Sequence, residues 1–547
     1  MYFLEEIIID PESLIPALLV FLPIFLYAEI HYRFPLLPSR IFRKQPEIVF
    51  DAPYRIETDS LPVLLLIKDA NIYPVTLEKV LIRIRFIGDR DYTLVEDFTE
   101  DVKINEHFYS KIYRIDVSRF SNHHIEIECT GIISMGKKRI TVRNDNYPTL
   151  SHDNFETYID TESLPAQAGW RWGDMHCHTA WTEDQVEFGI PAENIAGMAT
   201  PMGISFCAAT DHSYDLDDLH DSWNRNDPDL IKWSESREII KRLNRDAYNF
   251  TILPGEEVTA DNGFAKNVHM VVLNHNEFIP GNNDSLEKLF LKNTSRYYAD
   301  ILDDLNKNSM AYAAHPMTKP PLIQKILIRR GLWNRWDSAH PKLSGYQILN
   351  GHRREDFNNG LKLWVNHLLN GSRSYIYSGN DSHGNFNRFR QVKTPILKLH
   401  EKEEQIFGEF LTGVKSDSNN DIDILIQDLK RGSVIVSNGP FLNMTLYDNK
   451  KNSAEIGKTL IFKPARIELN AISTRFFGSL RSIRIIVGSL LTKGEHIFRK
   501  IELLSGIKSK TVEIPADNLP EKGYLRAEIT TRENRIALSN PIWFDYV

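Results

Sequence analysis

Histidine and acidic residues recur in six short motifs between positions 176 and 383. Imidazole nitrogens and carboxylate oxygens are together ligands that suit Zn, Mn and Fe. A single histidine of this kind is more often a core or surface residue, but an ordered series of motifs predicts a shared site for divalent cations. The motifs are HCH with His176 and His178, TDH with His212, GEE with Glu257, NVH with His269, AHP with His315, and DSH with Asp381 and His383.

Two of these motifs place their ligands two residues apart. Side chains alternate in direction along a strand, so His176 and His178 can point to the same side and reach one ion. Asp381 and His383 repeat this spacing. By the same alternation, Cys177 is expected to point away from the ion and to serve as a packing residue.

The motifs lie in or directly after short apolar segments that predict β-strands. Helix-like segments separate most of these strands, which predicts a mostly parallel sheet, either doubly wound or closed into a barrel. In a barrel, the carboxyl ends of the strands converge on one face, so ligands two hundred residues apart could meet there. The strand segments are 171–177, 203–209, 250–253, 267–273, 310–314, 345–349 and 375–378, and the helical segments are 191–202, 234–249, 284–306 and 356–370.

This ordered set of motifs resembles the PHP (polymerase and histidinol phosphatase) superfamily of metal-dependent hydrolases, and within it the CehA/McbA-like group. The resemblance covers roughly residues 168–440 and includes the segments GYQILNGH, LKLWVNHLLNGSR and LKRGSVIVSNGPFL. It implies a distorted seven-stranded β/α (TIM-like) barrel with two or three divalent ions, Mn, Zn or Fe. It also implies a hydrolase, with a small phosphate ester or nucleotide as the favoured substrate.

The resemblance also implies how the ligands are shared. Many relatives read HTxxSDG where this chain reads HTAWTEDQ, so the acid is either Glu183 or Asp184, and we favour Asp184. Glu257 would bridge two ions. The outer ion would be held by Asp184, His212 and His383, and the bridged pair by His176, His178 and Asp381 on one side and His269 and His315 on the other.

Such a centre predicts hydrolysis by a water whose pKa bound cations lower to about 7, so that a metal-bridged hydroxide attacks the ester. Asp211 and His275 are the candidates for protonating the leaving oxygen, and Asp211 could instead orient a neighbouring imidazole. Cations beyond the metals would hold a substrate phosphate, with Arg353 and Arg388 favoured because a guanidinium fork matches phosphate oxygens. Lys319 and Arg354 are the further candidates.

Outside this region the chain predicts two β domains and an apolar leader. Residues 46–150 and 436–547 alternate apolar and polar residues in short runs, which is typical of half-buried strands and favours a β-sandwich at each end. The polar segment 148–169 is expected to be a linker. The predicted domains are thus 1–45, 46–150, 168–435 and 436–547, and the chain is expected to be a multidomain α/β plus β protein.

The leader contains an uncharged apolar segment, residues 14–28, that could contact a membrane. It is shorter than the roughly 20 residues of a spanning helix and contains Pro16 and Pro23. If it inserts, the basic residues that follow it leave the rest of the chain in the cytoplasm. Three cysteines do not make a disulfide framework, which also favours a reducing, cytoplasmic location.

Composition and missing motifs exclude several classes of function. The formal charge of −8 provides no global basic field for duplex nucleic acid. Phosphate-binding glycine loops and a GxSxG elbow are both missing from the sequence, which argues against a nucleotide-cofactor enzyme and a serine esterase. Two alternatives stay open: a carboxylic ester or carbamate hydrolase using the same metal site, and a non-catalytic module in a membrane-associated assembly. An oligomer is also possible.

Overall fold

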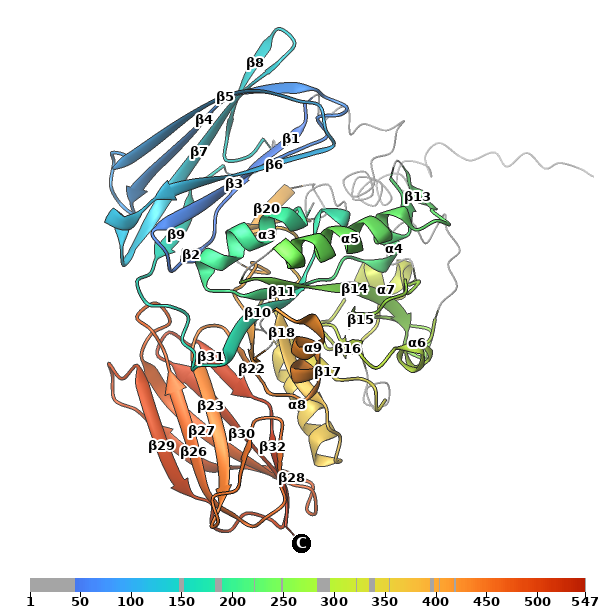
Figure 1. The fold of residues 1–547 in the computed structure, drawn as a ribbon, viewed down its shortest axis with the longest axis vertical. Helices are drawn as coiled ribbons and strands as arrows, with labels where there is room; N and C mark the ends of the chain where they lie inside the picture. Colours follow the sequence, from blue (N-terminus) through green and yellow to red (C-terminus); the bar gives the residue numbers. More distant parts are fainter. Residues whose placement is uncertain are drawn as a thin grey trace, which may run out of the picture.

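Strands dominate the fold, and they form three parts that follow one another along the chain. The computed structural model describes residues 45–146, 152–182, 189–220, 222–246, 249–282, 296–320, 322–333, 340–353, 355–393, 398–402, 404–417 and 420–546. Figure 1 shows the blue N-terminal sheets at the top, the green and yellow central part in the middle, and the orange and red C-terminal sheets below. The protein is therefore multidomain and mostly β, with several sheets.

The N-terminal part is a pair of sheets with a common apolar core. Alternating burial along its long strands, such as β4, places Val80, Ile82 and Ile84 inside. β9 belongs to this part and pairs with β7, so the predicted linker 148–169 contains a strand of the N-terminal domain. One sheet contains β1 (Glu47–Asp51), β3 (Ser60–Lys68) and β6 (Phe108–Asp116), and the other β2 (Arg55–Ile56), β9 (Phe155–Ile159), β7 (His123–Met135), β4 (Val75–Phe86), β5 (Leu94–Ile104) and β8 (Lys138–Arg143).

The central part places its strands side by side in the order β18, β17, β16, β15, β14, β11 and β10. Four neighbouring pairs are parallel, but β15 is antiparallel to both β14 and β16, so the sheet is mixed. Only residues 262–266 separate β14 from β15, which is too short a connection for a parallel crossover. The strands are β10 (Trp170–Cys177), β11 (Phe206–Ala209), β14 (Thr251–Asp261), β15 (Asn267–Leu273), β16 (Met310–Ala313), β17 (Gly345–Asn350) and β18 (Tyr375–Gly379).

The first and last of these strands also approach each other. The amide of Asp381, just after β18, donates to the carbonyl oxygen of His176 at 2.8 Å, and the amide of His178 donates to the carbonyl oxygen of Ser382 at 2.8 Å. At its start, however, over residues Trp170 to Gly173, β10 pairs with β21 (Leu411–Lys415). The two bonds therefore bring the segment after β18 against the end of β10.

The helices of the central part pack their apolar sides on the strands. In α8, Phe357, Gly360, Trp364 and Leu368 are buried at the spacing of one helical face. Three of the four predicted helical segments correspond to α3, α5 and α8. The fourth, 284–306, is described only from residue 296, and this part contains α6. The described helices are α3 (Ala192–Ala199), α4 (Ser213–Leu216), α5 (Ile231–Asp246), α6 (Tyr298–Asp304), α7 (Leu322–Leu327), α8 (Glu355–Leu369) and α9 (Ile422–Lys430).

The C-terminal part contains a second pair of sheets, and one of them is continuous with the central sheet. β22 (Val434–Ser437) pairs with β21 on one side and with β31 on the other, so the sheet crosses the predicted boundary at 435–436. The four-stranded sheet contains β24 (Ser453–Glu455), β23 (Phe441–Asp448), β26 (Pro464–Ile472) and β29 (Ser509–Pro515). The continuing sheet contains β31 (Ile536–Ser539), β30 (Lys522–Thr531), β27 (Leu480–Ser489), β28 (Gly494–Glu502), β32 (Ile542–Asp545) and β25 (Thr459–Leu460).

Within the described part of the chain, none of the helices has the length and apolar character needed to cross a membrane. The predicted apolar leader, residues 1–45 with the segment 14–28, lies outside the described residues except for its last residue.

Candidate metal centre

Eight of the nine predicted metal ligands come together in the central part, at one end of its strands. The parallel strands deliver ligands at or after their carboxyl ends, whereas antiparallel β15 delivers His269 near its beginning. The ninth predicted ligand, Asp184, and its alternative Glu183 lie outside the described residues. The eight are His176 in β10 and His178 after it, His212 after β11, Glu257 in β14, His269 in β15, His315 after β16, and Asp381 and His383 after β18.

Glu257 lies in the middle of this cluster, and each of its two carboxylate oxygens lies close to a different pair of imidazoles. Its Oε1 is 2.6 Å from Nδ1 of His269 and 3.0 Å from Nε2 of His315. Its Oε2 is 3.0 Å from Nδ1 of His212 and 3.4 Å from Nε2 of His176. A carboxylate with this arrangement can bridge two cations, as the resemblance implied.

Asp381 forms a second point of convergence. Its Oδ1 is 3.0 Å from Nε2 of His178 and 3.3 Å from Nε2 of His176, so the two histidines do point to one side. The ring of His383 stacks on that of His178, with centroids 4.2 Å apart. Three groups have ligand atoms that all lie within 4.8 Å of one another. They are His176, His178, Glu257 and Asp381; His178, His212 and His383; and His212, Glu257 and His269.

The donor atoms of this centre fit divalent cations because several are buried and lack hydrogen-bond partners. Nε2 of His176, Nδ1 of His212 and Oε2 of Glu257 make no hydrogen bond with any residue that the structure describes. Buried polar atoms are rarely left unsatisfied. Oε2 of Glu257 lies 3.4 Å from Nε2 of His176 and 3.0 Å from Nδ1 of His212, so these atoms can give their lone pairs to divalent cations.

The charges of the cluster are strongly coupled. Burial disfavours the ionised form of Glu257 and Asp381, yet the surrounding imidazoles hold the pKa of both carboxyls well below their usual range. Burial likewise disfavours a charged His176, but Asp381 and Glu257 raise its pKa to about 10. Burial and the neighbouring His212 lower the pKa of His178 to about 4. The two carboxylates thus attract positive charge, which divalent cations can supply in place of protons.

Two ligands occupy backbone conformations that side-chain-bearing residues seldom adopt. Asp381 has a φ of 53° and His315 a φ of 28°. Non-glycine residues held in this region cost about 1 to 3 kcal/mol each and cluster at functional sites. The left-handed turn at Asp381 directs its carboxylate back toward His176 and His178.

β17 supplies the groups that orient two of the ligands. Nδ1 of His176 lies 2.8 Å from Oε1 of Gln347, whose Nε2 donates to Oδ1 of Asn350 at 2.7 Å. Nδ2 of Asn350 in turn donates to Oδ2 of Asp381 at 3.3 Å. Metal-binding histidines usually donate their other ring nitrogen to such a partner. Neither amide was predicted from the sequence, because Gln347 and Asn350 are not metal-binding residue types and belong to an otherwise ordinary strand.

Asp211 is bonded to the loop after β10. Its carboxylate accepts from the amide of Thr179 at 2.7 Å and from the hydroxyls of Thr179 and Thr182 at 2.8 and 2.9 Å. Oγ1 of Thr182 lies 3.2 Å from Nδ1 of His178. Burial raises the pKa of Asp211. These contacts fit the orienting role that the sequence left open, rather than proton donation to a leaving group.

His275, the other predicted proton donor, lies at the opposite end of the strands. It follows β15, and its Nδ1 is 3.0 Å from the hydroxyl of Ser309. It lines an open pocket of about 700 Å³ together with Trp233 and Arg237. Because β15 runs antiparallel to β14, its carboxyl end is directed away from Glu257. His275 is therefore removed from the candidate catalytic residues.

The predicted phosphate-binding cations make their contacts elsewhere. The expectation that they point to the centre rested on strand order alone, and the partners given below lie in other parts of the fold. Arg354 lies outside the described residues. Arg388 donates to the backbone oxygens of Asp153 and Asn154, Arg353 donates to that of Asn534 at 3.5 Å, and Lys319 pairs with Glu355 at 3.0 Å.

A cation that the sequence analysis missed does contact the centre. Arg330 follows α7. Its Nη2 lies 2.8 Å from Nδ1 of His269, and its Nη1 contacts Nε2 of the same ring. Its position in an irregular segment, three residues after α7 (Leu322–Leu327), gave no signal in the sequence.

Comparisons with known proteins do not assign this chain to a family. No family model and no curated protein matches the chain. Among solved structures, a β-glucuronidase of Bacteroides uniformis is 8% identical with a TM-score of 0.17, covering 91% of this chain and 61% of that chain. A glycosyl hydrolase family 2 member from Bacteroides cellulosilyticus is 8% identical with a TM-score of 0.18, covering 91% of this chain and 63% of that chain.

A protein from Archaeoglobus fulgidus is 11% identical with a TM-score of 0.13, covering 18% of this chain and 96% of that chain. This chain thus spans about three fifths of the two Bacteroides proteins. Overlaps with TM-scores this low carry no argument about fold or function, so the centre has to be judged on its own chemistry.

Proposed function

We propose that the protein is a PHP-type metal-dependent hydrolase, and that phosphate esters are its favoured substrates. The observation that carries this proposal is the convergence of buried imidazoles and carboxylates on Glu257, with ligand atoms that lack hydrogen bonds to described residues. The strand order β10 to β18, and the two backbone bonds between β10 and the segment after β18, support a distorted barrel of the kind the sequence resemblance implies.

In this proposal the three ligand groups hold two or three divalent ions, Mn, Zn or Fe. Such ions polarise an ester oxygen and lower the pKa of a water molecule, which makes a nucleophile available near neutral pH. Glu257 would hold two ions through its two oxygens. Gln347 fixes the ring of His176, and Asp211 fixes that of His178 through Thr182, so the ligands are oriented before substrate binds.

The test is metal analysis of the full chain followed by a substrate panel. We expect the purified protein to contain at least two equivalents of divalent metal and to release phosphate from small phosphate esters with added Mn²⁺. The double variant His176→Ala, Asp381→Ala should lose both metal and turnover. His496→Ala, an exposed histidine in β28, is the matched control and should keep both. Metal content unchanged in the double variant would refute the site.

A carboxylic ester or carbamate hydrolase is the second candidate. It is favoured by one observation, namely that Arg353, Arg388 and Lys319 make contacts with described residues that lie outside the centre. The same panel separates the two candidates. Turnover of carboxylic esters or carbamates by the metal-loaded protein, without release of phosphate from any ester tested, would replace the first proposal with the second.

A further inference from the structure

Two amide side chains hold one oxygen of the Asp381 carboxylate. Nδ2 of Asn350 and Nε2 of Gln405 both donate to Oδ2 of Asp381, each at 3.3 Å. The other oxygen, Oδ1, lies 3.0 Å from Nε2 of His178 and 3.3 Å from Nε2 of His176. The two oxygens therefore have different surroundings, with amide donors at Oδ2 and candidate metal ligands at Oδ1.

The backbone of Gln405 is fixed against the turn after β17. Gln405 lies between β20 (Lys398–Lys402) and β21, outside the strands that carry the candidate ligands. Its amide donates to the carbonyl oxygen of Gly351 at 3.0 Å, and its φ of 56° is left-handed. A Cβ atom on Gly351 would lie 2.5 Å from Cα of Gln405, so a glycine is needed for this approach. This packing keeps the side chain of Gln405 beside Asp381.

The different surroundings of the two oxygens determine how Asp381 can bind a cation. A carboxylate binds an ion through one oxygen or through both, and the second mode uses two positions around the ion instead of one. Each carboxylate oxygen has about two lone-pair sites, and the donors Asn350 and Gln405 compete with an ion for those of Oδ2. An ion bound through Oδ1 alone would keep a position for water or an ester oxygen, which a catalytic metal site needs.

We propose that Gln405 is a positioning residue of the metal centre. Together with Asn350 it holds Oδ2 of Asp381, so that Asp381 binds a divalent ion through Oδ1 alone. This inference rests on the proposed function and adds to it a residue that acts through a ligand rather than on the ions or the substrate.

The experiment measures the Kd for Mn²⁺ of the full chain by competition with a chelator, together with the melting temperature of the metal-free protein. Gln405→Met keeps the unbranched length of the side chain but removes its donor. It should weaken Mn²⁺ binding by about 10- to 100-fold, as is usual when a group that orients a ligand is lost. The metal-free melting temperature should stay at the wild-type value. Asn350 is a poorer target because it also accepts from Gln347.

A second measurement tests the one-oxygen arrangement directly. The relaxation of water protons by bound Mn²⁺ reports the water molecules that the ion carries. When Gln405 no longer holds Oδ2 of Asp381, this oxygen can take a position that water occupies in the wild-type protein. The relaxation per bound Mn²⁺ should therefore be lower in Gln405→Met than in the wild-type chain.

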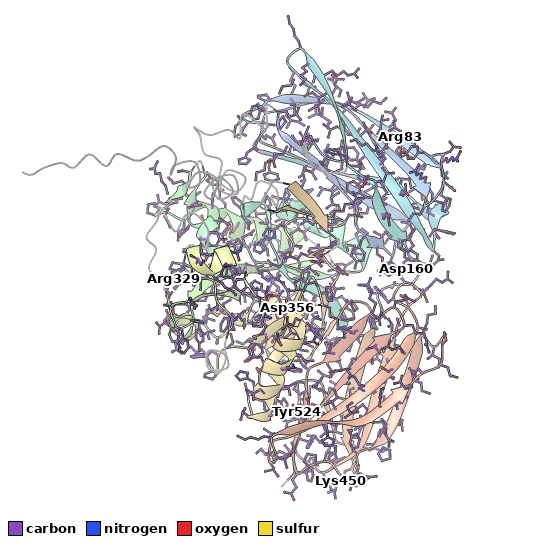
Figure 2. The ribbon with its side chains drawn as sticks, turned by 180° about the vertical axis from the view of Figure 1, so that it is seen from behind. Arg83, Asp160, Arg329, Asp356, Lys450 and Tyr524 are labelled. Atoms are coloured by element: carbon purple, nitrogen blue, oxygen red, sulfur yellow. The ribbon has the colours of Figure 1, made fainter. Side chains whose placement is uncertain are left out.

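Gln167→Met is the matched control. Gln167 is half-buried like Gln405, but its Oε1 accepts from Nδ2 of Asn443 in β23 at 2.9 Å. It lies in the segment that follows Asp160, which Figure 2 shows between the N-terminal and the C-terminal sheets. This variant should keep the wild-type Kd and relaxation.

Each other result is decisive. A wild-type Kd in Gln405→Met, or an equal loss in Gln167→Met, overturns the role of Gln405 while leaving the metal centre in place. A lower metal-free melting temperature, or failure of Gln405→Met to fold, also overturns it, because Gln405 would then support the fold itself. Weaker binding with unchanged relaxation overturns the one-oxygen arrangement. Failure of the wild-type chain to bind any divalent metal refutes the proposed function, and this inference with it.

Discussion

Substitution of Gly379 by alanine should disrupt metal binding although Gly379 is not a ligand. Gly379 is the last residue of β18, where the chain passes closest to β10. A Cβ atom at this position would lie 2.5 Å from the backbone nitrogen of His176 and 2.7 Å from its Cβ. Real Cβ atoms do not approach so closely, and neither neighbour is the flexible end of a side chain. Either β10 or β18 must therefore move.

The size of that movement decides whether the candidate metal ligands keep their spacing. Restoring an ordinary contact of 3.4 Å requires the atoms to separate by about 0.9 Å. Metal sites keep ligand distances within roughly 0.2 Å of their preferred values, and His176 and Asp381 lie on the two segments that would separate. Overpacking of this kind costs about 1 to 3 kcal/mol of stability. We therefore expect Gly379→Ala to fold with a lowered melting temperature and to lose most of its metal.

The assay compares melting temperature with and without saturating Mn²⁺, together with elemental analysis. A metal that binds only the folded state at 100 times its Kd adds about 2.7 kcal/mol of stability, and this increment should be largely absent in Gly379→Ala. Gly494→Ala is the control, because a Cβ there meets nothing closer than 3.7 Å. If Gly379→Ala retains the wild-type metal content and melting increment, the approach of β18 to β10 does not set the ligand spacing.

Two further predictions concern residues near the centre. Gln347→Leu should weaken metal binding by about 10- to 100-fold, because the ring of His176 loses its orienting partner; competition with a chelator measures this, and an unchanged Kd would contradict it. Burial raises the pKa of Asp217 from 3.8 to about 7, so the folded state favours its neutral carboxyl. The contribution of Asp217 to the free energy of unfolding is therefore largest below pH 4 and is lost as the pH rises to 7. Asp217→Asn should therefore raise the melting temperature more at pH 8 than at pH 4, and an equal difference at both values would refute it.

The sequence was sufficient to find most of the candidate ligands because their chemistry is local. Residue type identifies His212 or His315 as a possible ligand, and strand alternation places His176 and His178 on the same side. The β-rich character of both ends of the chain also followed from short-range alternation, which β4 retains in its burial. These properties depend on a few neighbouring residues, so one sequence reveals them.

The predictions that failed, and the residue that was missed, depend instead on which way each strand runs and which segments it pairs with. His275 follows a predicted strand of a mostly parallel sheet whose carboxyl ends were expected to meet on one face, but β15 is reversed by a five-residue connection. The same reversal explains why His269 lies at the start of its strand. Arg330 reaches the centre through a left-handed residue, Arg329 with a φ of 55°, and bonds to β15. Such long-range pairings leave no periodic pattern in the sequence.

The link between the backbone of β10 and the turn after β18 would make folding depend on metal binding at the proposed centre. Asp381 donates its amide to His176 while its own carboxylate faces the imidazoles of His176 and His178, so one turn fixes both the sheet contact and the ligand geometry. The positive φ of Asp381 opposes this turn by about 1 to 3 kcal/mol. A cation that binds only the folded state adds stability of comparable size. A cation bound as we propose would therefore offset the cost of this turn.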